Sequence, residues 1–301
     1  KLIVLHLGVH IKEAYHNLIN NLAPIYGNRE SNNISDWVIE YLTGWDRSKR
    51  LIYHDALLDE EQLEKFQSFK RELINGRPVQ YVLGESWFAG MSFFVDERVL
   101  IPRPETEELV DFISKKYHPM QTSQNDVFKL LDIGTGSGCI AIALKKRFPD
   151  WEIWGVDESQ AALEVSSINA EKQNTHIHLK RVDITKDIEI DSLPPFNVIV
   201  SNPPYIPLSD KSEMADHVLK FEPHQALFVT DNDPLQFYKK IISFSEYHLL
   251  RGGHLFFETH VDYARDVANL LEDNDFEYVE IKQDFQERDR IVCGKKTGAS
   301  L

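Results

Sequence analysis

Between residues 128 and 294, short apolar runs alternate with segments of helical periodicity, and this alternation constrains the fold more than any other feature. The apolar runs predict seven strands, at 128–133, 152–156, 177–181, 196–200, 254–258, 276–282 and 290–293. The periodic segments predict helices at 139–147, 160–173, 235–248 and 263–273. Strands and helices that alternate in this way form a mostly parallel sheet covered by helices on both faces. The predicted fold class is therefore α/β.

The preceding part of the chain follows a different pattern. Up to about residue 76, apolar residues recur at helical spacing, which predicts a small helical bundle. The recurring residues are Ile34, Val38, Tyr41, Leu42, Leu63, Phe66, Phe69 and Leu73. Asp59 can cap the second helical segment, and Gly76 followed by Pro78 can end it.

A β-hairpin is predicted between these two regions. Residues 81–95 are rich in aromatic and other β-prone side chains, and Ala89-Gly90 offers a turn among them. We therefore expect three parts: a helical domain over 1–78, a hairpin linker over 79–100, and an α/β domain over 101–301.

Composition limits the class of partner. The chain has 301 residues and a formal net charge of −15, which argues against a grip on long stretches of nucleic acid backbone. Cys139 and Cys293 are expected to be buried thiols, and the spacing of the histidines predicts no metal site. The apolar segment 1–9 is too short to span a bilayer and lacks a small-residue cleavage site. We expect a cytoplasmic protein without membrane or direct nucleic acid partners.

The first strand of the α/β region runs into a glycine-rich turn, residues 134–138, which we call the glycine loop. Glycine permits positive φ and a close approach of a ligand, and ligands of open parallel sheets bind beyond the carboxyl ends of the strands. The spacing is G-x-G-x-G and differs from the dinucleotide fingerprint G-x-G-x-x-G. Asp132 would repel a pyrophosphate but would suit a cationic amine and a sulfonium. The candidate cofactor residues here are Asp132, Gly134, Thr135, Gly136, Ser137 and Gly138.

Acidic residues also follow the next two predicted strands. Asp157 lies at the end of the second strand, where a carboxylate can bind both hydroxyls of a ribose. Alternatively, it caps the helix that starts near Ser159. Asp183 and Ile184 follow the third strand, where they could contact an adenine amino group and ring. An ordinary turn residue and a core residue explain this second pair equally well.

The fourth predicted strand leads into Asn202-Pro203-Pro204-Tyr205, which we call the Asn-Pro-Pro-Tyr turn. Both prolines lack an N–H and have a restricted φ, so the turn is stiff and its carbonyls have no local donors. Asn202 adds an amide oxygen and an NH₂ group, and Tyr205 can stack on a flat substrate. The turn can thus hold a planar group that donates N–H bonds. These are also ordinary turn residues, so the segment by itself is compatible with a purely structural role.

Taken together, the glycine loop, Asp157 and the Asn-Pro-Pro-Tyr turn resemble the class I S-adenosylmethionine-dependent methyltransferases. The turn is similar to the [DN]-P-P-[YFW] motif of members that methylate planar amino or amide nitrogens. The resemblance implies a Rossmann-like, mostly parallel sheet of seven strands. It also implies S-adenosyl-L-methionine as cofactor, with Asp157 on its ribose, and S-adenosyl-L-homocysteine as product.

Further segments resemble the PrmC/HemK-type protein-(glutamine) methyltransferases, over about residues 34–294. They are 76–81, Gly84, Phe88, Gly90, 99–107, 201–205, 221–223 and 226–227. The resemblance implies methylation of the glutamine amide in the Gly-Gly-Gln motif of peptide chain release factors, and thus a role in translation termination. Residues 1–20 show no clear match. Ile184 stands where the family often has an aromatic residue, and 257–260 depart from the usual Glu-Ile-Gly or Glu-His-Gly.

The resemblance implies that Asn202, Pro203, Pro204 and Tyr205 bind the substrate. On physical grounds, Asn202 Oδ1 and the Pro203 carbonyl could accept the two N–H bonds of the substrate amide, and Tyr205 would hold the amide plane by packing. Asn202, Pro203 and Tyr205 are the predicted catalytic residues, and Asn202 is also expected beside the cofactor.

Two segments outside the turn could border the site. Arg103 or Glu105 could reach the edge of the cofactor pocket, and the non-periodic stretch 206–226 is a candidate lid.

Two alternatives stay open on the sequence. The first is a methyltransferase that acts on the adenine amino group of DNA or RNA, whose flipped base the same turn would hold. The second is an interaction module that binds S-adenosylmethionine without catalysis. The net charge and the lack of an aromatic and basic nucleic acid domain count against the first. The complete Asn-Pro-Pro-Tyr turn counts against the second.

Overall fold

The computed structural model describes residues 8–117, 127–186 and 193–297. The chain divides into a smaller unit, Lys1–Glu85 with Ala215–Phe221, and a larger one, Ser86–Met214 with Glu222–Leu301. The hairpin predicted as a linker belongs to the larger unit, and a segment far along the chain belongs to the smaller one. The division into 1–78, 79–100 and 101–301 stays a prediction.

The smaller unit is helical, as predicted. It contains α1 (Ile11–Thr43), α2 (Arg47–Ile52), α3 (Glu60–Ile74), α4 (Val79–Leu83) and α8 (Asp216–Phe221). The Asp59 side chain caps α3 by accepting a bond from the Gln62 amide at 2.8 Å. Apolar side chains of α1, α3 and α4 form one core. Tyr41 was predicted on this apolar face but is 46% exposed, with its ring edge against Phe69.

The larger unit contains the predicted seven-stranded sheet. The strands are β3 (Lys129–Ile133), β4 (Glu152–Asp157), β5 (His178–Arg181), β6 (Phe196–Ser201), β9 (Leu249–Glu258), β10 (Phe276–Gln283) and β11 (Asp289–Lys296). Their order is β10-β11-β9-β6-β3-β4-β5, and β11 alone runs in the direction opposite to the other six strands. The chain direction across the sheet reverses between β3 and β6. In open α/β sheets, such a switch point is where ligands bind.

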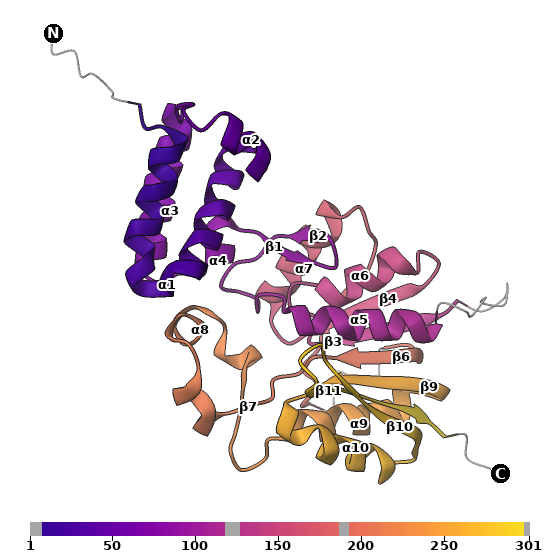
Figure 1. Cartoon of the computed structure of the whole chain (residues 1–301). Helices are drawn as coiled ribbons and strands as arrows, with labels where there is room; N and C mark the ends of the chain where they lie inside the picture. The colour runs from indigo at the N-terminus through magenta and orange to yellow at the C-terminus, as the bar shows by residue number, and fades with distance from the viewer. Residues whose placement is uncertain (1–7, 118–126, 187–192, 298–301) are drawn as a thin grey trace. The chain divides into compact units, whose positions relative to one another are not determined.

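Helices cover both faces of this sheet (Figure 1). They are α5 (Pro104–Tyr117), α6 (Cys139–Arg147) and α7 (Gln160–Lys172) on one face, and α9 (Gln236–His248) and α10 (Ala264–Glu272) on the other. Because successive side chains of a strand point to opposite faces, Leu130 and Phe256 join the first core while Leu131 and Phe257 join the second. Both cysteines are buried and free, as predicted.

The chain also contains short elements that are not part of the seven-stranded sheet. The predicted hairpin consists of β1 (Ser86–Phe88) and β2 (Met91–Phe93), and Ala89-Gly90 turn between them with positive φ. The stretch 206–226 is not an irregular loop as its pattern suggested. It contains β7 (Ile206–Pro207), which pairs with β8 (Phe228–Val229), the 3₁₀ helices η2 (Leu208–Glu213) and η3 (His224–Ala226), and α8. Elements of two to six residues are too short to show a periodicity.

The helix η4 (Val261–Tyr263) follows β9 and precedes α10. Within the described ranges, no helix combines the length and the apolar character that crossing a membrane requires.

Candidate active site

The glycine loop connects β3 to α6 at the switch point of the sheet. Gly134, Gly136 and Gly138 have φ of 73°, 54° and 81°, values that strain other residues. The amides of Gly134 and Thr135 both donate to the Val156 carbonyl, at 2.9 and 3.0 Å, and anchor the loop to β4. A side chain at Gly134 or Gly136 would project into space with at most one backbone atom nearby, so a ligand can approach the backbone there.

Helix α7 holds the loop from the other side. Ser166 Oγ donates to the Gly136 carbonyl at 2.7 Å, and Asn169 Nδ2 donates to the Ser137 carbonyl at 2.9 Å. Both side chains are fully buried. Sequence reasoning missed these two supports, because a polar residue inside a helix is usually solvent-exposed and its long-range partner is set by packing.

Asp132 lies beneath the glycine loop. It is fully buried, and its Oδ2 accepts a bond from Thr135 Oγ1 at 2.7 Å. Its Oδ1 makes no hydrogen bond of normal geometry with the described residues. Burial raises the pKa of this carboxyl to about 7, although the Thr135 bond and the nearby Ala141 amide oppose the rise. Gly155 on β4 makes room for this pair, since a Cβ there would lie 2.9 Å from Thr135 Oγ1.

Asp157 ends β4 and binds the loop backbone. Its Oδ2 accepts a bond from the Gly136 amide at 3.0 Å, and its Oδ1 accepts one from the Ser159 amide at 2.9 Å. Burial raises the pKa of its carboxyl, and these two bonds counteract the rise. The cap of α7 is Ser159, so the alternative of Asp157 as that cap is wrong. Each Asp157 oxygen keeps a lone pair for a ligand.

Asp183 and Ile184 follow β5. The Asp183 carboxylate binds the Thr185 amide and hydroxyl and forms an ion pair with Lys186 at 2.8 Å. The contact with Lys186 contributes most to lowering the pKa of the Asp183 carboxyl, and the bonds from Thr185 lower it further. Ile184 is partly buried against the second core of the sheet.

The Asn-Pro-Pro-Tyr turn follows β6 and therefore lies beside the glycine loop, because β6 and β3 are neighbours. Asn202 Nδ2 donates to Thr106 Oγ1 at 3.2 Å. The Tyr205 hydroxyl donates to Glu258 Oε1 at 3.2 Å, and its ring packs against the second core. Burial, together with the nearby Glu258 charge, raises the pKa of Tyr205, so its hydroxyl stays protonated.

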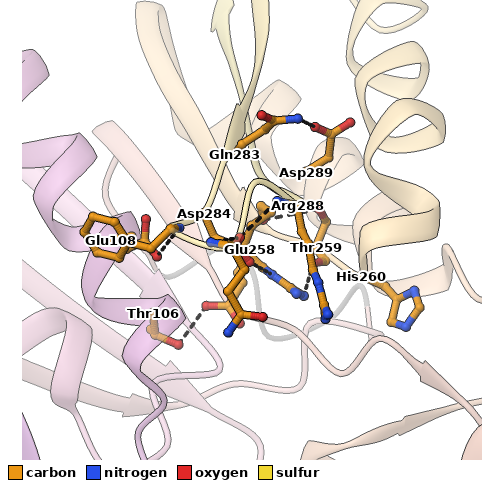
Figure 2. A network of polar contacts seen from close by, with 12 residues as sticks. Thr106, Glu108, Glu258, Thr259, His260, Gln283, Asp284, Arg288 and Asp289 are labelled. Atoms are coloured by element: carbon orange, nitrogen blue, oxygen red, sulfur yellow. Dashed lines mark hydrogen bonds and ion pairs between the residues drawn. The ribbon is translucent and has the colours of Figure 1, made fainter.

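Glu258 joins the turn to α5. It is 1% exposed at the end of β9, and its Oε2 accepts a bond from Thr106 Oγ1 at 2.7 Å. Figure 2 shows these two side chains pointing toward one another from their separate elements. Burial raises the pKa of the Glu258 carboxyl, whereas the Thr106 bond and the Arg290 charge lower it. Thr106 and Glu258 lie in segments that the sequence singled out, but the sequence predicted no role for either residue. The signal that could have indicated Glu258 is a charged residue directly after the apolar run 255–257.

Glu222 joins two segments, 99–103 and 222–223, that form one wall of a cavity. It is buried, and its Oε1 pairs with Arg103 at 2.6 Å while its Oε2 accepts a bond from the Ile101 amide at 3.2 Å. The neighbouring residues Val99, Leu100 and Pro223 line this cavity. Arg103 pairs with Glu222 through a contact that the sequence did not reveal, but Arg103 itself is not among the residues that line the cavity, so its place at the edge of a cofactor pocket stays a prediction.

Most of the predicted site residues line one cavity. They are Gly134, Gly136, Asp157, Asp183, Ile184, Asn202, Pro203 and Pro204. The predicted residues outside its lining are Asp132, Thr135, Ser137, Gly138 and Tyr205, which lie beneath or beside the lining residues. The carboxyl ends of β3, β4, β5 and β6 thus converge on a single cavity, and Gly134 and Gly136 leave space beside the backbone of the loop there.

Comparison with known proteins gives the chain a family context. Residues 118–227 match the family model of the Methyltransferase small domain, and residues 13–84 match that of the PrmC N-terminal domain. The similarity therefore begins near residue 13, earlier than the motifs indicated.

Curated relatives match most of the chain. A release factor glutamine methyltransferase of Flavobacterium psychrophilum is 37% identical over 284 residues, which cover 94% of this chain and 98% of that protein. That of Bacteroides thetaiotaomicron is 36% identical and covers 92% and 96%. That of Streptococcus pneumoniae is 43% identical and covers 70% and 72%.

Solved structures share the fold. The hMettl16 catalytic domain, solved in complex with a 3'UTR hairpin, has a TM-score of 0.50 at 14% identity, covering 80% of this chain and 84% of that one. At this identity the likeness shows the fold alone.

Proposed function

The chain belongs to the family of release factor glutamine methyltransferases, and on that basis we propose how its site acts. The enzyme transfers a methyl group from S-adenosylmethionine to the amide nitrogen of the glutamine in the Gly-Gly-Gln motif of release factors. One observation carries the proposal: the glycine loop, Asp157 and the Asn-Pro-Pro-Tyr turn border a single cavity at the switch point of the sheet. Because its substrate acts in translation, we place the enzyme in the cytoplasm.

The residues of the cavity fit S-adenosylmethionine. The free lone pairs of Asp157 suit the ribose hydroxyls, and the open glycine positions leave room for the ligand at the loop. Ile184 offers an aliphatic surface for the adenine, and Asp183 offers an acceptor for its amino group. The unpartnered Asp132 Oδ1 suits the positive charge of the methionine part, directly or through water. When bound, the cofactor supplies a methyl group activated on a sulfonium.

The Asn-Pro-Pro-Tyr turn fits the substrate amide. An amide nitrogen is a poor nucleophile because its lone pair is delocalised into the carbonyl. If Asn202 Oδ1 and the Pro203 carbonyl accept its two N–H bonds, they orient the nitrogen and raise its electron density; such positioning contributes several kcal/mol in favourable cases. Tyr205 does not line the cavity, so we propose that it holds the amide plane by supporting the turn from behind.

A transfer assay tests this function. Labelled S-adenosylmethionine is supplied with the cognate release factor, with the same factor carrying Gln→Ala in its Gly-Gly-Gln motif, and with duplex DNA. We expect label on the natural factor and at least 100-fold less on the other two, because only the natural factor presents the amide. Equal labelling of the alanine variant would refute the proposal, and labelling of DNA would favour the adenine alternative.

Cofactor affinity is expected to depend on pH through Asp132. Its pKa of about 7 means that the carboxylate is ionised above this pH and neutral below it. An ionised group attracts the cationic cofactor, so affinity is highest above pH 7 and falls as pH drops, by roughly tenfold between pH 7.5 and 6. Calorimetric titrations across this range measure the effect. Asp132→Asn is the control, and its cofactor affinity should not vary with pH in this range. If the affinity of the variant falls with pH as that of the wild type does, Asp132 is not the source of the dependence.

A further inference from the structure

A chain of hydrogen bonds runs behind the Asn-Pro-Pro-Tyr turn. Asn202 Nδ2 donates to Thr106 Oγ1 at 3.2 Å, and Thr106 Oγ1 donates to Glu258 Oε2 at 2.7 Å. Tyr205 occupies the other oxygen of Glu258, at 3.2 Å. Thr106 and Glu258 are 3% and 1% exposed, so water does not compete for these bonds. These hydrogen bonds therefore link α5, β9 and the Asn-Pro-Pro-Tyr turn in one network around the buried Thr106 and Glu258.

The protons of this network determine how the Asn202 amide is oriented. A threonine hydroxyl has one hydrogen to donate, and Thr106 gives it to the Glu258 carboxylate. Its oxygen can then only accept from Asn202, so the NH₂ end of that amide must face Thr106. Both oxygens of Glu258 act as acceptors, one for the Thr106 hydroxyl and one for the Tyr205 hydroxyl. Burial raises the pKa of this carboxyl, whereas the Thr106 bond and the Arg290 charge oppose the rise. The Asn202 oxygen consequently points away from Thr106, and it has no hydrogen-bond partner among the described residues.

This orientation decides which group the turn can bind. The Asn202 oxygen and the Pro203 carbonyl are both acceptors, and Pro204 has no N–H to place beside them. Two acceptors match the two N–H donors of a primary amide, whereas a carboxylate has no hydrogen to offer them. If the Asn202 amide were reversed, its NH₂ would face the substrate and would suit a carboxylate.

We propose that Thr106 and Glu258 are positioning residues that lock the Asn202 amide with its oxygen toward the substrate, and that this lock makes the site select glutamine over glutamate. The inference rests on the proposed function, because it concerns how the same turn recognises its substrate. Neither residue contacts the substrate in this scheme; both act through Asn202. Tyr205 stabilises the lock by holding the second Glu258 oxygen in place.

Thr106→Val tests the lock, because valine keeps the shape of threonine and removes both hydrogen bonds. We expect kcat/KM for the natural release factor to fall about 30-fold, since the amide is no longer held in one orientation. Inhibition by a release factor carrying Gln→Glu should become about 10-fold stronger than in the wild type. Cofactor affinity should change less than twofold. Kinetics, inhibition constants and calorimetry measure the three quantities.

Two further variants separate positioning from a merely structural role. Thr106→Ser restores the hydroxyl and should return both kcat/KM and the weak inhibition by the glutamate factor to within about threefold of the wild type. Thr106→Val combined with Glu258→Gln should be no worse than Thr106→Val alone, because the two residues act in one chain. If Thr106→Val does not fold, Glu258→Gln alone should still lower kcat/KM and strengthen glutamate inhibition.

The outcomes distinguish this inference from the proposed function. A wild-type enzyme that methylates no release factor would refute the function itself. Normal wild-type transfer, with inhibition by the glutamate factor unchanged in Thr106→Val and in Glu258→Gln, would refute the lock alone. A Thr106→Ser variant as impaired as Thr106→Val would also refute it, since the loss would then follow from packing.

Discussion

Replacement of Asn202 with alanine is expected to lower kcat/KM for methyl transfer by about 10²- to 10³-fold while cofactor affinity changes little. The variant removes the amide oxygen that accepts a substrate N–H, and the loss of one preorganised polar group at a reacting centre has effects of this size. The cofactor keeps Asp157 and the glycine loop, whose mutual bonds do not involve Asn202. Single-turnover transfer rates and calorimetry measure the two properties separately.

Asn197 provides a matched control for this variant. It lies on β6, the strand that leads into the turn, near the end away from Asn202, and its Oδ1 accepts a bond from the Lys129 amide at 2.8 Å. Asn197→Ala should lose about 1 kcal/mol of stability and keep its transfer rate. If Asn202→Ala loses cofactor binding and transfer in equal measure, Asn202 mainly shapes the cofactor pocket and its proposed role toward the substrate is wrong.

Replacement of Glu222 with alanine is expected to destabilise the larger unit by about 2–3 kcal/mol and to weaken cofactor binding at least 10-fold. The buried carboxylate holds both Arg103 and the Ile101 amide, and removal of one partner of a buried pair leaves the others unsatisfied. Arg103 is about one-third exposed, so water compensates part of this loss. Cofactor binding should suffer because Val99, Leu100 and Pro223 lose their shared support.

Denaturant unfolding and cofactor titration measure these effects. Glu164→Ala is the control, since Glu164 pairs with Arg98 at 3.2 Å on the surface and should cost less than about 0.5 kcal/mol. A Glu222→Ala variant as stable as Glu164→Ala would show that the buried pair does not hold the wall of the cavity.

Local patterns predicted the regular elements well because those elements are long or strongly apolar. All seven strands of the sheet occur where apolar runs indicated them, and Asp59 caps its helix as its position suggested. The stretch 206–226 was misjudged as irregular because its elements are too short for a periodicity to show. Tyr41 followed the helical spacing but lies at the exposed edge of the apolar face, since spacing alone does not show how wide that face is.

The sequence by itself determined the α/β class, the glycine loop and the Asn-Pro-Pro-Tyr turn, because glycine, proline and apolar periodicity act through the local backbone. Only the tertiary structure decided that β6 lies beside β3, which brings the turn next to the loop despite about sixty intervening residues. It alone joined Asn202 to Thr106, 96 positions away in the sequence, and Thr106 to Glu258, 152 positions away. The orientation of one amide depends on such distant partners, since a hydrogen bond is set by proximity in space and leaves no local pattern in the chain.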